Sequence, residues 1–228
     1  MTETLTIEEI NCDYILHIGS KEIAYLVYPG TDPLPKKWLS DLSNEYGVTI
    51  CVVHVPADRW NDLLTPWAEP SEAKGFPPFG GKASEFLKKF QEKIIPEIEK
   101  VAKIYQLKSR NLIGVSLSGL FSLWQWMFCD TFTSIASLSG SFWYPGFLEW
   151  FENKTLPIKI GKAFFLLGEK EPKAKIKAYQ SVGINTEKIV EKLKSKGYHV
   201  SFEWVSGDHF SNPLKRVELA FRNLYQIN

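Results

Sequence analysis

Two short segments of the chain carry residue types that together could perform nucleophilic catalysis. Ser116 lies in the string Gly-Val-Ser-Leu-Ser-Gly at residues 114–119, between an apolar run typical of a strand and a run typical of a helix. A serine at such a sharp strand–turn–helix corner has a strained backbone, and the residues two before and two after it must be small. Gly114 and Ser118 meet this requirement, although Ser118 stands where glycine is usual. Ser116 is therefore the candidate nucleophile.

The tetrapeptide Ser-Leu-Ser-Gly occurs a second time at residues 137–140, so the motif alone does not identify the nucleophile. In this second copy Ile135 stands two residues before the first serine, where a sharp corner leaves no room for a branched side chain. The copy is soon followed by Pro145-Gly146, which cannot continue as a helix. We therefore expect residues 137–140 to end a strand close to the site without reacting.

A base for Ser116 is expected in the turn Ser-Gly-Asp-His-Phe at residues 206–210. Its histidine, His209, follows a predicted strand and precedes the last predicted helix, whereas the other three of the four histidines lie in or at the start of strand patterns. In parallel α/β sheets the loops at the carboxyl ends of the strands line the site, so the two loops can meet. His209 is therefore the candidate general base.

The acid that orients His209 is expected between these two loops, after another strand. The apolar run 163–167 is followed by Gly-Glu-Lys-Glu-Pro, which offers Glu169 and Glu171. The order serine, acid, histidine along the chain is one in which such triads occur. Glu171 is preferred because it follows Gly168 by three residues. This spacing lets the chain leave the strand before the carboxylate turns back toward the histidine. Glu169 stays as the alternative.

These residue types imply a specific division of roles. His209 would take the proton of Ser116, whose free hydroxyl is a poor nucleophile at neutral pH. The acid would fix the imidazole tautomer and stabilise the imidazolium. Backbone N–H groups would stabilise the tetrahedral oxyanion. The N–H of Leu117 is one expected donor, and Gly30 or Thr31, after the second predicted strand, is expected to supply the other.

The elements that must position these residues alternate between strand and helix from residue 22 onward. An N-terminal β-hairpin is expected from Tyr14–Ile18 and Ile23–Tyr28. Later strands are expected at 48–55, 111–115, 134–139, 163–167 and 199–205, with helices at 35–46, at 83–105 with a kink at Pro96, at 119–128, from 185–186 to 197, and from 212–213 onward. Such alternation predicts an α/β fold with a mostly parallel central sheet and helices on both faces. Residues 1–228 are expected to form a single domain without a separate lid domain.

The long connection at residues 56–81 shows no regular pattern, and it is rich in proline, glycine and aromatic residues. Long loops in compact domains are usually functional or disordered, and the aromatic content favours a functional loop. Four aromatic residues in this loop and after the second tetrapeptide are candidate walls of a substrate pocket: Trp60, Trp67, Trp143 and Tyr144. The same residues could equally belong to the core.

The composition argues against several other function classes. Hydrophobic residues make up 44% of the 228-residue chain and charged residues 23%, as in globular proteins. A net charge of +1 gives no electrostatic reason to expect nucleic acid or an anionic membrane as a partner. Three cysteines without a Cys-x-x-Cys pair argue against a zinc site or a redox dithiol, so neither metal nor cofactor is expected. The acidic N-terminus and the lack of a long apolar run favour a cytoplasmic protein.

At this point the sequence resembles a known family, the esterase branch of the α/β hydrolases that contains esterase D and the enterochelin esterases. The resemblance covers most of the chain and rests on five segments: Trp60-Asn-Asp-Leu with Thr65-Pro-Trp67, Gly114–Gly119, Ser139–Tyr144, Gly168–Glu171 and Gly207–Phe210. It implies an α/β-hydrolase fold, a serine–acid–histidine triad, no metal and small-molecule carboxylic esters as substrates. Two departures are Ser118 in place of glycine and a glutamate where aspartate is commoner.

Three alternatives to ester hydrolysis stay open at this stage. An acyltransferase would use the same triad with an alcohol in place of water, and a peptidase would share the strand–turn–helix corner. A catalytically degenerate, binding-only member of the fold would follow if Ser118 distorted the corner or if neither glutamate reached His209. The natural substrate and the oligomeric state are not predicted by the sequence.

Overall fold

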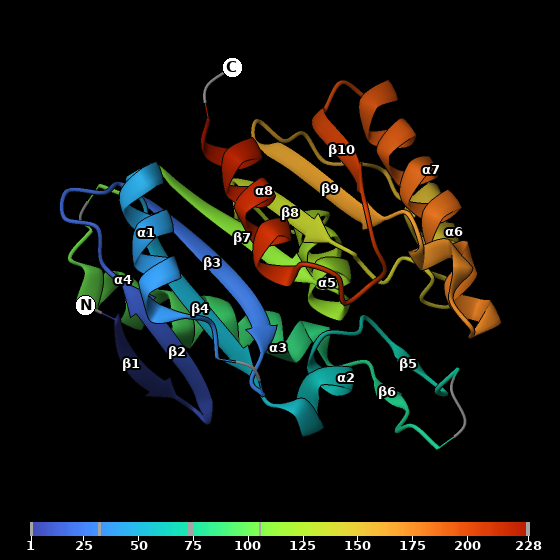
Figure 1. Ribbon diagram of the computed structural model, residues 1–228, viewed down its shortest axis with the longest axis horizontal. Helices are drawn as coiled ribbons and strands as arrows, with labels where there is room; N and C mark the ends of the chain where they lie inside the picture. The colour runs from blue at the N-terminus through green and yellow to red at the C-terminus, as the bar shows by residue number, and fades with distance from the viewer. Residues whose placement is uncertain (1, 32, 73–74, 105, 227–228) are drawn as a thin grey trace.

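An eight-stranded sheet forms the centre of the computed structural model, which describes residues 2–31, 33–72, 75–104 and 106–226 (Figure 1). In chain order its strands are β1 (Thr2–Ile7), β2 (Ile10–Ile15), β3 (Glu22–Pro29), β4 (Thr49–Val55), β7 (Ser109–Val115), β8 (Ser134–Leu138), β9 (Lys162–Gly168) and β10 (His199–Val205). Their order across the sheet is β1-β2-β4-β3-β7-β8-β9-β10. The six strands from β4 to β10 in this order are parallel to one another. The predicted, mostly parallel sheet is confirmed.

The predicted N-terminal hairpin exists, but it is formed by other residues than Tyr14–Ile18 and Ile23–Tyr28. It is formed by β1 and β2, which pair antiparallel around a turn in which Glu8 and Glu9 have positive φ. The two runs predicted to pair with each other, which became β2 and β3, are separated by β4. β2 pairs antiparallel with β4, and β3 pairs parallel with β4 and β7. A strand that is apolar on both faces fits the middle of a parallel sheet better than one arm of a hairpin.

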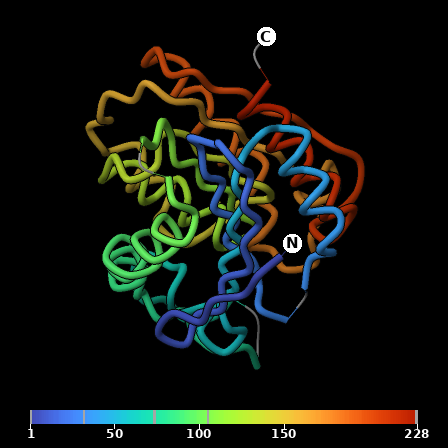
Figure 2. The backbone as a smooth tube through the Cα atoms, turned by 90° about the vertical axis from the view of Figure 1, so that its left-hand side faces the viewer, coloured from blue at the N-terminus to red at the C-terminus, as the bar shows by residue number. Residues whose placement is uncertain are grey.

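Helices cover both faces of the sheet, as predicted. One face carries α1 (Lys36–Tyr46) and α8 (Pro213–Tyr225), which lie in front of the strands in Figure 1 and on the opposite side from the green helices in Figure 2. The other face carries five helices: α3 (Ala83–Lys89), α4 (Ile95–Ala102), α5 (Leu117–Trp126), α6 (Phe147–Asn153) and α7 (Val182–Ser195). Along β3, Tyr25 and Val27 belong to the core of the second face, whereas Ala24 and Leu26 belong to that of the first. The buried strand therefore separates two hydrophobic cores.

Two predicted helices have a boundary that differs from the structure by more than two residues. The predicted helix 83–105 is interrupted by a π-helical turn at Phe90–Ile94, directly before Pro96, where a wider turn relieves the clash that proline makes inside a helix. It ends at Ala102, and Tyr105 lies outside the described residues. Helix α7 begins at Val182 and not after residues 185–186. Thr186 does not cap this helix, because its hydroxyl bonds back to the carbonyl of Val182 inside it.

The connection at 56–81 is more ordered than its sequence suggested. Its described part contains a 3₁₀ turn (Ala57–Arg59), α2 (Trp60–Leu63) and a two-stranded ribbon of β5 (Ala68–Glu69) and β6 (Phe79–Gly80). Gly81 has a φ of 69°, and a Cβ there would overlap the backbone of Trp67, so only glycine fits this close approach. None of the helices in the described residues is long and apolar enough to cross a membrane.

Candidate active site

Ser116 occupies the sharp corner between β7 and α5. Its φ of 57° and ψ of −120° are a strained combination for a residue with a side chain. The corner is fixed from two sides, because the N–H of Ser116 donates to Leu138 O at 2.9 Å and its carbonyl accepts from the N–H of Ser141 at 3.1 Å. A Cβ on Gly114 would overlap the carbonyl oxygen of Ser118. The geometry therefore explains why the residue two before the candidate nucleophile is glycine.

Ser118, which stands where glycine is usual, fits this corner without distorting it. Its side chain is fully buried, and its Oγ lies 2.7 Å from Val27 O on β3 and 2.8 Å from Val115 O. The same oxygen accepts the N–H of Val115 at 2.7 Å. The hydroxyl thus fills the narrow gap between β3, β7 and α5 and satisfies buried polar groups there.

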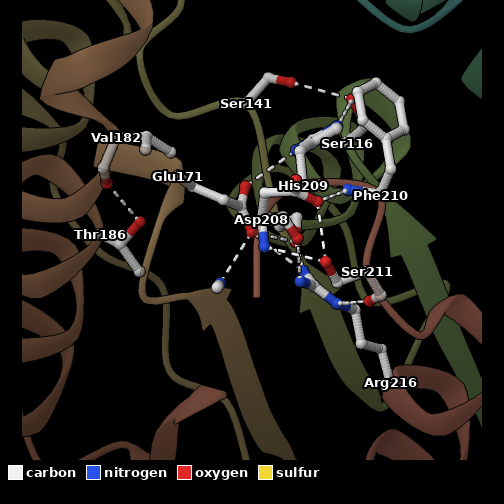
Figure 3. Close-up of polar contacts among 12 residues, drawn as sticks. Ser116, Ser141, Glu171, Val182, Thr186, Asp208, His209, Phe210, Ser211 and Arg216 are labelled. Atoms are coloured by element: carbon white, nitrogen blue, oxygen red, sulfur yellow. Dashed lines mark hydrogen bonds and ion pairs between the residues drawn. The ribbon is translucent and has the colours of Figure 1, made fainter. Parts of the chain in front are cut away.

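Three side chains meet above the carboxyl ends of β7, β9 and β10 (Figure 3). His209 Nε2 lies 3.1 Å from Ser116 Oγ, and His209 Nδ1 lies 2.8 Å from Glu171 Oε2. Glu169, the alternative acid, is exposed, and its backbone N–H bonds to Val205 O. Of the two candidate acids, the structure therefore brings only Glu171 to His209.

The carboxylate of Glu171 is buried but well compensated. Its other oxygen, Oε1, accepts bonds from Gly168 N at 2.7 Å, Ser139 Oγ at 2.7 Å and Arg216 Nη1 at 2.9 Å. Burial alone would raise the pKa of Glu171, but the bonds and charges from His209, Ser139 and Arg216 lower this pKa to about 2. Glu171 is therefore ionised at neutral pH and can stabilise a positive charge on the imidazole.

The second Ser-Leu-Ser-Gly copy lies beside this group, at the end of β8. Ser137 pairs in register with Gly114 of β7, and within the described residues its buried hydroxyl has no hydrogen-bond partner. Ser139 has a φ of 51° and bonds to Glu171, as described above. Ser141 Oγ lies 3.4 Å from Ser116 Oγ. Neither Ser137 nor Ser139 contacts a base, in keeping with the expectation that this copy ends a strand next to the site.

The candidate oxyanion-hole donors are not equivalent. Leu117 is the first residue of α5, and the N–H groups of a first helical turn have no acceptor within their own helix. The N–H of Gly30 already donates to Val55 O at 2.8 Å, so in this structure it is not free for an oxyanion. Thr31, the exposed next residue, remains as the candidate second donor.

The candidate pocket walls divide between core and surface. Tyr144 is only 2% exposed and its hydroxyl donates to Trp67 O, so it is a core residue and not a pocket wall. Trp67 packs on Tyr144, and its indole N–H donates to Pro145 O at 3.1 Å, which gives it a structural role as well. Trp60 and Trp143 are half-buried. Trp143 packs against Tyr179, with ring centroids 4.0 Å apart and the ring planes tilted by 32°.

Sequence reasoning missed the residues that hold Glu171, namely Ser139 and Arg216. A signal for Arg216 was present, since a cation in the first turn of a helix opposes the helix dipole and needs another reason to be there. Ser139 was part of a quoted motif but had no role assigned. Within the described part of the chain, no three His, Cys, Asp or Glu side chains are grouped so that they could hold a metal ion.

Comparisons with known proteins identify the family and the fold of the chain. A family model described as "Putative esterase" matches residues 35–209. Uncharacterized protein YbbA of Bacillus subtilis (strain 168) is 30% identical over 151 residues, a match that covers 65% of this chain and 60% of that protein's length. An IroE-like serine hydrolase from Shewanella oneidensis superposes with a TM-score of 0.79 at 18% identity, over 100% of this chain and 82% of that one. The siderophore hydrolase EstB from Aspergillus nidulans superposes with a TM-score of 0.74 at 16% identity, over 99% and 94% of the two chains. At these identities the two structures show a shared fold.

Proposed function

Because the chain belongs to the Putative esterase family and has the α/β-hydrolase fold, we propose that it is a serine esterase that hydrolyses small-molecule carboxylic esters through an acyl-enzyme. The observation that carries this proposal is the hydrogen-bonded series from Ser116 through His209 to Glu171. The strained backbone of Ser116 at the carboxyl end of β7 supports the same assignment.

In the acylation step, His209 Nε2 removes the proton from Ser116 as Oγ bonds to the ester carbonyl carbon. The carbonyl π-electrons move to oxygen, and the N–H of Leu117, with Thr31 as the second donor, stabilises the resulting oxyanion. The intermediate collapses, the C–O bond to the alcohol breaks, and the imidazolium gives its proton to the leaving alkoxide. Water then repeats the sequence on the acyl-enzyme, which releases the acid and restores the serine.

Glu171 supports both steps by holding His209 in one tautomer. With Oε2 at 2.8 Å from Nδ1, that nitrogen carries the proton and Nε2 is free to accept one from Ser116. Because the pKa of Glu171 is about 2, the carboxylate stays charged at neutral pH. It therefore stabilises the imidazolium that forms during acylation.

The site is open enough for water to act as the acyl acceptor. The His209 side chain keeps 31% of its surface exposed, and Thr31 and Phe210 beside the site are exposed as well. Water can therefore reach the acyl-enzyme without a conformational change. Two of the similar structures are described as siderophore hydrolases, and a siderophore-like ester is one small molecule to include among the substrates tested.

The test combines covalent labelling with ester turnover. The protein is treated with a fluorophosphonate probe, the adduct is located by mass spectrometry, and p-nitrophenyl esters of increasing acyl length are assayed. We expect labelling at Ser116 and turnover, both abolished in Ser116→Ala and His209→Ala. The matched controls are Ser137→Ala, the equivalent serine of the second tetrapeptide, and His199→Ala, an exposed histidine, and both should keep wild-type activity. A folded wild-type protein that neither reacts with the probe nor hydrolyses any ester would refute the proposal.

A further inference from the structure

Arg216 sits in an environment that helix electrostatics alone does not favour. It lies in the first turn of α8, where the helix dipole repels a cation, and only 4% of its surface is exposed. A buried guanidinium is costly unless its donors are satisfied by good partners. Its contacts must therefore account for its position.

Those contacts reach three loops, each following a different strand of the sheet (Figure 3). Nη1 donates to Glu171 Oε1 at 2.9 Å, in the loop after β9, and to Ser139 Oγ, in the loop after β8. Nη2 donates to the carbonyl of Asp208 and Nε to that of Ser211 at 2.8 Å. The last two carbonyls lie on either side of His209. One side chain thus holds the candidate acid directly and the loop of the candidate base from both ends.

The surrounding backbone leaves room for the guanidinium and for little else. A Cβ at Gly168 would lie 2.8 Å from Arg216 Nη2, 2.6 Å from Gly207 O and 3.0 Å from Glu171 Oε1. Any side chain at position 168 would therefore push apart the groups that Arg216 connects. Glycine is therefore required at position 168 both by the close approach of Gly207 O at the strand end and by the guanidinium of Arg216.

The two carboxylate oxygens of Glu171 have different hydrogen-bond partners. Oε1 is used by Gly168, Ser139 and Arg216, which leaves Oε2 for His209. The charged groups that contact Glu171 are Arg216 from α8 and, when protonated, His209 from the loop before it. Without the cation, a carboxylate that is 6% exposed would lose its only permanent countercharge among these contacts.

We propose that Arg216 is a positioning residue of the esterase site, which keeps Glu171 charged and aimed at His209 and fixes the loop that carries His209. This inference rests on the proposed function and extends it, because it assigns catalytic geometry to a helix outside the triad. Arg216 does not touch the substrate. Its effect should therefore appear in kcat and depend on Glu171.

The experiment compares Arg216→Met and Arg216→Lys with Arg222→Met, a matched control on the exposed side of the same helix. Each variant is measured for kcat, KM, the pH profile of kcat/KM and the melting temperature. Glu171→Gln and the double variant E171Q/R216M complete a cycle. In the double variant both charges are removed, so no buried ion is left unpaired and folding is protected.

We expect R216M to lower kcat about 100-fold, the size of effect seen when partners that orient catalytic groups are lost, with KM within about twofold of wild type. The kcat of R216K should lie between those of R216M and wild type, because an ammonium keeps the charge but cannot make the divergent bonds of a guanidinium. In R216M the pKa of Glu171 rises without the cation, so a second protonation should make kcat/KM fall more steeply at the acid end of the profile than in wild type. E171Q and E171Q/R216M should differ in kcat much less than wild type and R216M do, because the part of the effect that acts through Glu171 is absent from both.

Two results would overturn the inference while leaving the proposed function intact. The first is an R216M protein that keeps half or more of the wild-type kcat. The second is an R216M loss that is equally large in the E171Q background, which would mean a general structural effect. If R216M does not fold, the comparison of R216K with wild type and of E171Q with the double variant decides the question. Failure of the proposed function is a separate outcome, recognised by a wild-type protein without labelling or turnover.

Discussion

Acid should destabilise this protein through one buried carboxylate in particular. The ordinary pKa of 4.5 for Glu171 would be raised by burial, but bonds and charges from His209, Ser139 and Arg216 lower it to about 2 in the folded protein. At about 1.4 kcal/mol per pKa unit, this difference corresponds to about 3 kcal/mol of stability. Because the folded pKa is the lower one, the contribution is present above pH 4.5 and is lost as the pH falls toward 2.

The measurement is urea unfolding of the wild type and of E171Q/R216M at several values between pH 7 and pH 3. Between pH 5 and pH 3 the wild type should lose about 2 kcal/mol more unfolding free energy than the double variant, since only part of the transition falls in this range. All other carboxylates are shared by the two proteins, so their effects cancel in the comparison. Parallel pH dependences would show that Glu171 is not held at a low pKa, and the electrostatic reasoning about the site would fail.

Three further predictions concern the corner and the acid. Gly114→Ala should destabilise by about 3 kcal/mol and abolish probe labelling, because its Cβ overlaps Ser118 O; thermal melting and labelling check this. Ser118→Gly, although it restores the usual residue, should cost about 2 kcal/mol in urea unfolding, since the buried N–H of Val115 loses its acceptor; an unchanged stability would contradict it. Glu171→Gln should lower kcat at least about 100-fold, whereas Glu169→Gln should keep it, in the same ester assay.

The elements of the sheet were predictable where one local rule decides them. β4 and β9 are apolar on both faces, and α1 ends at Gly47, which has the positive φ that a helix end requires. The hairpin was misassigned because pairing between strands depends on contacts that local sequence does not show. β1 is a half-exposed edge strand with a weak pattern, and β4 inserts between two strands that are neighbours in sequence.

Most residues of the site could be predicted because each follows a strand of a parallel sheet. The prediction stayed incomplete because the rest depends on the direction of side chains. Ser116, His209 and the 168–171 segment each follow a strand, and a parallel sheet brings such loops to one edge, so their meeting follows from topology. The choice between Glu169 and Glu171 depends on a side-chain direction, which no spacing rule gives. Tyr144 was placed in a pocket because its sequence neighbours are near the site, whereas its ring packs against Phe79 in the core.

The repeated tetrapeptide shows how one sequence can serve two purposes. In the first copy, small residues around Ser116 let a strand turn sharply into a helix. In the second copy the strand does not turn directly into a helix. Its Ser139 bonds to Glu171, and Ser141, which follows the copy, bonds through its N–H to the carbonyl of Ser116. Because β7 and β8 are parallel neighbours and Ser137 pairs with Gly114, the second copy begins two residues earlier in register than the first. The proposed nucleophile and a serine that holds the proposed acid therefore have the same local sequence, and only the first lies at a strand-to-helix corner.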